Sequence, residues 1–162
     1  MQNDYRFQPR RGLSGGETEG VEFKSTLRTN LHAKQPDEKM HLAVLKTLAA
    51  FLNAGGGTLL IGVADDGSVV GVAADGFQSE DKMSLHLVNL VRDRIGALFL
   101  PYLHPKFVDE DGGRVLTVRC ERGPKPAFVT DGGAQRFYVR GANATVELSG
   151  QAIVDYTAQR FK

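Results

Sequence analysis

Apolar residues recur at three- and four-residue spacing in two long segments of the chain. Residues 37–55 place these residues on one broad helical face, with Asp37 suited to the first turn and Gly55 to a left-handed exit. Residues 79–98 show the same kind of stripe. The tail, residues 148–161, has the pattern of a short helix. The pattern therefore predicts two long helices and a short C-terminal one.

Shorter apolar runs alternate with polar residues and predict strands. They lie at residues 19–24, 58–63, 106–109, 114–121 and 135–140. The turn Asp65-Asp66-Gly67 predicts a hairpin into a further strand at residues 69–72. Turn signals rich in Gly, Asp and Pro separate the later runs, which indicates a mostly antiparallel meander.

The length and composition indicate one globular domain. The 162 residues, 41% hydrophobic and 24% charged, exclude a wholly disordered chain. Residues 1–16 lack sustained periodicity, so we expect a flexible N-terminal arm before a single domain at residues 17–162. No apolar run approaches the roughly 20 residues of a membrane span, and we expect a cytoplasmic protein with no membrane partner.

Three consecutive glycines, residues 55–57, raise the question of nucleotide binding. A Walker-type loop precedes a helix and carries a lysine, whereas these glycines follow a helix and open a strand. No lysine or arginine lies between Gly55 and Gly71. The pattern favours a tight corner between packed layers, and an ATP-binding regulator is a minor alternative.

Charge and metal-ligand spacing narrow the candidate chemistry. Residues 114–140 contain six basic and two acidic side chains, which could form either a phosphate-facing surface or a solvated strand face. Cys120 is the single cysteine, so no internal disulfide can form. The four histidines show no metal-binding spacing, and the sequence predicts no metal cage from them.

Three blocks together resemble a known family. "GETEGVEFKST", "LAAFLNAGGGTLLIGVADDGSVVGV" and "RFYVRGANATVELS" are similar to the AlbA_2 domain of Schlafen proteins, over roughly residues 17–153. The resemblance implies an α+β fold with a mixed, mostly antiparallel sheet backed by helices, and a role in binding DNA or RNA. Nuclease members carry two such lobes, which form an RNA-binding cleft. This chain has one, so we expect a homodimer.

The resemblance also implies candidate catalytic residues. Glu17 and Glu22 match the two glutamates of the family's E-x-x-x-x-E-F-K motif, and Asp65 is the best match for a third carboxylate. Three converging carboxylates could hold Mg²⁺ or Mn²⁺ and activate a water for phosphodiester cleavage. A metal-dependent endoribonuclease is therefore the alternative function. Solvated strand acids are the simpler interpretation of each residue alone.

The preferred interpretation is nucleic-acid binding that requires no cofactor. Alternation in R-F-Y-V-R places Arg136, Tyr138 and Arg140 on one strand face, where two guanidiniums could meet phosphates and the tyrosine could stack on a base. Lys24 is a further cation beside the acidic strand. We expect these four residues to contact nucleic acid.

Overall fold

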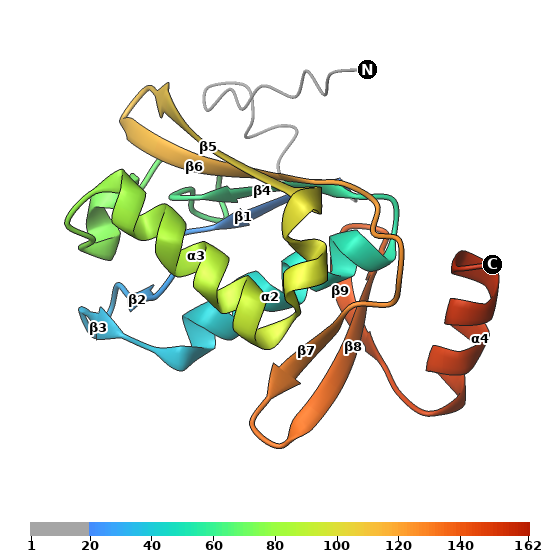
Figure 1. Ribbon diagram of the computed structural model, residues 1–162. Coiled ribbons are helices and arrows are strands. Elements are labelled where there is room, and N and C mark those ends of the chain that lie inside the picture. The colour runs from blue at the N-terminus through green and yellow to red at the C-terminus, as the bar shows by residue number, and fades with distance from the viewer. Residues whose placement is uncertain (1–19) are drawn as a thin grey trace.

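The computed structural model describes residues 20–162 and contains two main sheets (Figure 1). The larger has the order β1-β4-β6-β5, with β1 parallel to β4 and the other pairs antiparallel. The bounds are β1 Val21–Lys24, β4 Gly57–Ile61, β5 Leu103–Glu110 and β6 Gly113–Cys120. An antiparallel sheet contains β7 Phe128–Asp131, β8 Ala134–Gly141 and β9 Ala144–Leu148. The pair β2 Thr29–Asn30 and β3 Gln35–Pro36 forms a small hairpin.

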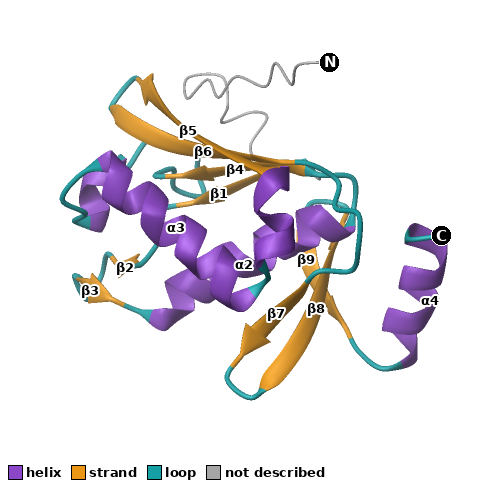
Figure 2. Cartoon of the chain, viewed as in Figure 1, coloured by secondary structure: helices purple, strands orange, loops and turns teal. Residues whose placement is uncertain are grey.

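The two long helices build the core between the two sheets (Figure 2). The helix bounds are α2 Glu38–Asn53, α3 Glu80–Arg94 and α4 Gln151–Arg160, with short 3₁₀ segments η1 Val72–Asp75 and η2 Ala97–Tyr102. Buried residues of α2 and α3 pack in one cluster with those of β4, β6, β7 and β8. This arrangement confirms the predicted α+β class, with a mixed, mostly antiparallel strand set, two long helices and a short C-terminal helix.

The start of α2 agrees with its sequence pattern. Asp37 is the N-cap, and its carboxylate accepts a hydrogen bond from the amide of Lys39 at 2.9 Å. The apolar stripe then buries almost the whole second half of the helix against both sheets. Because α2 is covered on two sides, its position fixes how the sheets face one another.

Two element predictions were wrong. The expected strand at residues 69–72 is reduced to one bridge between Val63 and Val69, because both Val70 and Gly71 donate to the carbonyl of Gly62. The expected helix over 79–98 ends at Arg94, since Gly96 adopts a φ of 139°. The apolar pattern of residues 79–98 extends beyond the end of α3 because Phe99 of η2 packs in the same core.

The three glycines form the predicted tight corner, but the left-handed residue is Gly56 and not Gly55. Gly56 has a φ of 86°, and a Cβ on it would lie 2.6 Å from the carbonyl oxygen of Cys120. A Cβ on Gly57 would lie 2.4 Å from the ring of Phe51. A Cβ on Gly55 would meet nothing within 4 Å. The corner thus lets α2 turn closely onto the sheet.

The C-terminal end of α2 is held by residues distant in sequence. Asn53 is fully buried, and its amide bonds to the backbone of Ala127 and Tyr138. The hydroxyl of Tyr156 in α4 donates to the carbonyl of Asn53 at 2.6 Å. Arg160 donates to the carbonyls of Leu52, Ala54 and Gly123. Its guanidinium thus lies at the negative end of the helix dipole, where a cation is favourable.

None of the helices within residues 20–162 has the length and apolar character of a membrane span.

Candidate nucleic-acid interface

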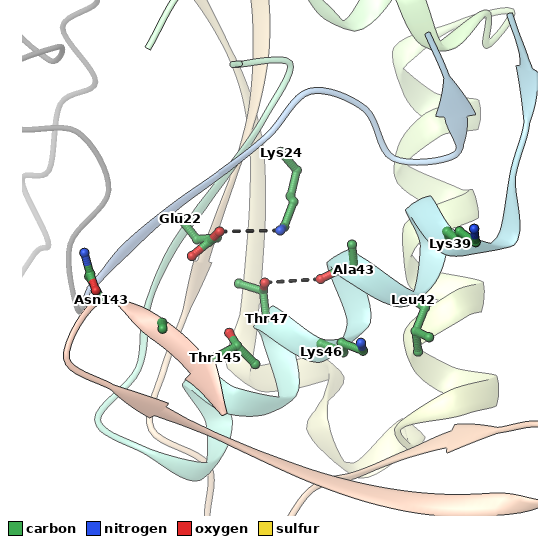
Figure 3. Close-up of a pocket in the computed structure, with 10 residues that line it drawn as sticks. Glu22, Lys24, Lys39, Leu42, Ala43, Lys46, Thr47, Asn143 and Thr145 are labelled. Carbon is green, nitrogen blue, oxygen red and sulfur yellow. Dashed lines mark hydrogen bonds and ion pairs between the residues drawn. The ribbon is translucent and has the colours of Figure 1, made fainter. Parts of the chain in front are cut away.

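A cleft of about 550 Å³ lies beside the first half of α2. Its walls come from three places: β1, the exposed face of α2, and the turn and start of β9 (Figure 3). We call this site the lysine cleft, because Lys24, Lys39 and Lys46 line it. The other lining residues are Glu22, Leu42, Ala43, Thr47, Asn143, Ala144 and Thr145.

Helical periodicity places the two α2 lysines on one face. Residues 39, 42, 43 and 46 follow the spacing i, i+3, i+4 and i+7, so they share one side of the helix. Seven residues of helix separate Lys39 from Lys46, which corresponds to about 10 Å along the axis. Among the residues that line the cleft there is neither an arginine nor an aromatic ring. The cleft therefore offers compact ammonium charges, which suit phosphates, and no surface for base stacking.

Glu22 lies in the cleft but is engaged by two cations. One of its carboxylate oxygens accepts from Nη1 of Arg140 at 2.7 Å, and the other lies 3.4 Å from Nζ of Lys24. Arg140 also donates to Oγ1 of Thr145 at 3.2 Å, and its guanidinium lies 5.1 Å from the ring centroid of Phe51. Arg140 and Lys24 thus place two positive charges against the single negative charge of Glu22.

The expected solvent-facing row of Arg136, Tyr138 and Arg140 is not what the structure contains. Tyr138 is 3% exposed, the side chain of Arg140 is 1% exposed, and burial raises the pKa of Tyr138 above its ordinary value. Arg136 is more accessible but pairs with Asp131 at 3.1 Å and Glu147 at 3.2 Å. The physical reason is that α2 packs on the face of β8 that carries Tyr138 and Arg140. The alternating residues therefore face a helix and not the solvent.

The candidate carboxylates show no assembled metal site in the described part of the chain. Glu17 lies outside the described residues. Glu22 is held by Arg140 and Lys24, and Asp65 is exposed in the turn that follows β4. No three His, Cys, Asp or Glu side chains of residues 20–162 are placed to hold a metal ion. A divalent cation at Glu22 would have to compete with two side-chain cations.

Of the three lysines that line the cleft, only Lys24 was a candidate from the sequence, and Lys39 and Lys46 were not singled out. Their seven-residue spacing on the polar side of α2 was the available signal, since that spacing returns to the same face of a helix. It gave no indication that β1 and the β8–β9 turn would close a cleft over this face, because both contacts are between segments distant in sequence.

Comparisons with known proteins agree with this fold. The structure is similar to the crystal structure of the DIP2311 protein from Corynebacterium diphtheriae, with a TM-score of 0.61 and 16% sequence identity. The alignment covers 89% of this chain and 28% of that one, so this chain spans under a third of the length of that protein. At this identity the likeness concerns the fold alone. No curated protein matches the chain.

The sequence profile described as "Schlafen, AlbA_2" matches residues 17–149, which is most of the chain. The match includes β1, the α2–β4 corner and the lysine cleft. The chain belongs to the Schlafen AlbA_2 family.

Proposed function

We propose that this protein binds nucleic acid through its phosphate backbone and that the lysine cleft is the contact site. The observation that carries the proposal is that Lys24, Lys39 and Lys46 line one concave surface, beside Glu22, whose carboxylate also accepts from Arg140. Lysine ammonium groups contact phosphates without regard to base identity, so binding of this kind is electrostatic and depends on salt. It requires no cofactor.

The roles of the predicted residues change accordingly. Lys24 stays a direct contact. Arg140 acts from beneath the cleft, where it holds Glu22 in place. Arg136 and Tyr138 lie on β8 outside the lining of the cleft, and any contact they make with nucleic acid is separate from it.

The experiment is fluorescence anisotropy with labelled single-stranded RNA, single-stranded DNA and duplex DNA over a range of salt concentrations. A variant that makes one phosphate contact fewer should have a slope of log K against log salt that is smaller by about 0.9 for duplex or about 0.7 for a single strand. We therefore expect K39A and K46A each to weaken binding to every probe and to flatten the slope. The control is K106A, which removes an exposed lysine from β5, at the opposite edge of the sheet from β1.

Binding that does not change with salt would contradict the proposal. So would K39A and K46A proteins that bind as tightly as K106A, because the cleft would then not be the contact site. Absence of binding to all three probes at low salt would remove the function itself.

Metal-dependent RNA cleavage stays a prediction. The structural support for it is weaker, because Glu22 is already engaged by Arg140 and Lys24. Incubation of the protein with tRNA and Mn²⁺, alongside an E22Q variant, tests it directly. Equal cleavage by both proteins, or none by either, would exclude Glu22 as a catalytic residue.

A further inference from the structure

Two histidines from different helices meet between α2 and α3, outside the lysine cleft. Nε2 of His41 lies 2.9 Å from Nε2 of His86, and the two ring centroids are 5.0 Å apart. Phe77 packs against the ring of His86, with centroids 5.2 Å apart. A hydrogen bond between two ring nitrogens needs one donor and one acceptor, so one ring directs a lone pair at the other.

Glu38 determines which ring supplies the lone pair. Its Oε1 lies 3.3 Å from Nδ1 of His41, and its other oxygen pairs with Arg94. A carboxylate in this position accepts from Nδ1–H, which leaves Nε2 of His41 as the unprotonated nitrogen. The same carboxylate–histidine contact orients histidine ligands in metal sites. Burial lowers the pKa of His86, which favours its neutral ring.

We propose that His41 and His86 bind a borderline divalent metal ion, such as Zn²⁺, through their Nε2 atoms. Ligands 2.0–2.1 Å from a tetrahedral zinc lie about 3.4 Å apart, so the two nitrogens need to separate by only about half an ångström. His86 moves its own proton from Nε2 to Nδ1, and both rings stay neutral. Imidazole suits Zn²⁺, Cu²⁺ and Ni²⁺ and does not suit Mg²⁺.

The site is open. Within residues 20–162 no third His, Cys, Asp or Glu completes a protein cage, so water or a donor from a bound ligand occupies the remaining coordination positions. Arg28 is an unfavourable charge near His86, and Arg94 is a second cation close by, paired with Glu38. The guanidinium of Arg28 lies over Phe77 at 3.7 Å and donates to the carbonyls of Asp75 and Gly76, which hold it in a fixed position. Because the site has only two protein ligands and lies near a positively charged side chain, we expect the metal ion to bind weakly and to exchange, unlike a structural zinc.

The test is calorimetric titration of the purified full chain with ZnCl₂, CuCl₂ and MgCl₂, together with thermal unfolding in the presence of each salt. We expect one Zn²⁺ or Cu²⁺ per chain, with Cu²⁺ the tighter, an increase in Tm that EDTA reverses, and no effect of Mg²⁺. H41Q and H86Q should each abolish binding. E38A, which removes the acceptor of the Nδ1 proton, should weaken it by about 10- to 100-fold. The control is H104Q, which alters an exposed histidine paired with Glu121 and should leave binding unchanged.

Absence of Zn²⁺ and Cu²⁺ binding to the unmodified protein would overturn the proposal, as would full binding by H86Q or loss of binding by H104Q. Should H86Q lower the Tm without metal, H86F keeps a ring against Phe77 and serves as the second variant. Metal binding by folded H86F would equally overturn the proposal. The lysine cleft lies on another face of α2, so this result is independent of the nucleic-acid experiment.

Discussion

Arg140 is a charged side chain in a position where charge is costly. Its side chain is 1% exposed, and its partners include Glu22, Thr145 and the face of Phe51. A guanidinium removed from water is tolerated only when a carboxylate and hydrogen-bond acceptors replace the lost hydration. Arg140 therefore joins β8 to β1, the edge strand of the other sheet.

Replacing Arg140 with methionine should lower the free energy of unfolding by about 3–5 kcal/mol, because the largely buried carboxylate of Glu22 loses its main partner. Urea denaturation measures the change. The double variant E22Q/R140M should recover a substantial part of the loss, since no uncompensated buried charge is left. The control is R136A, which removes an accessible arginine of the same strand and should change stability much less. Equal losses in R140M and R136A would contradict this account.

These same residues show the limit of sequence reasoning at this scale. The alternation in residues 136–140 correctly indicated a strand, but it did not reveal that α2 covers one face of it. The partner of Arg140 is 118 positions away in the chain, so no local pattern could identify it. Lys24 was found because it lies within a recognisable motif, whereas Lys39 and Lys46 required knowledge of which side of α2 stays open.

At the scale of elements, the corner between α2 and β4 was predicted in kind but not in detail. The helix stripe, three glycines and a short apolar run indicated a helix, a turn and a strand, and all three are present. A side chain at Gly56 is excluded by the carbonyl of Cys120 in β6, which packs against the corner. Similarly, β7 and β9 were missed because they are defined by their pairing with β8.

Exchanging Gly56 for alanine should destabilise the protein by about 2–5 kcal/mol. The cost combines a left-handed backbone for a residue with Cβ, about 1–2 kcal/mol, and a collision with the Cys120 carbonyl, about 1–3 kcal/mol. G55A is the matched control, because its Cβ would meet no atom within 4 Å and its φ is not positive. Denaturant midpoints compare the two variants, and a G55A protein as unstable as G56A would show that the corner depends on something else.

At the scale of the molecule, the described chain offers one lysine cleft, with lysines spread over about 10 Å of helix. A nucleic-acid strand longer than this extends beyond the cleft, and a second copy of the chain could engage the next phosphates. The homodimer expected from the two-lobed relatives stays a prediction, and it would place a second cleft beside the first. Composition could not identify the site, because the net charge of the chain is only +1. The attraction for phosphates comes from the clustering of lysines on one surface.

Light scattering coupled to gel filtration should give the mass of two subunits at micromolar concentration, and a mass of one subunit would reject the dimer. If dimers form and both clefts contact one strand, the salt slope should be about twice that of a single-cleft protein. A dimer with the salt slope of a single cleft would show that the chain self-associates but that only one cleft contacts the strand.

The contacts of α4 have a practical consequence for where this domain is taken to end. The family match stops at residue 149, whereas Tyr156 and Arg160 lie beyond it and cover the last carbonyls of α2. Cutting the chain at the family boundary would remove these side-chain donors, so that Leu52 would keep only the amide of Gly123, next to the glycine corner and the buried Asn53. The smallest piece that preserves the end of the central helix therefore reaches Arg160.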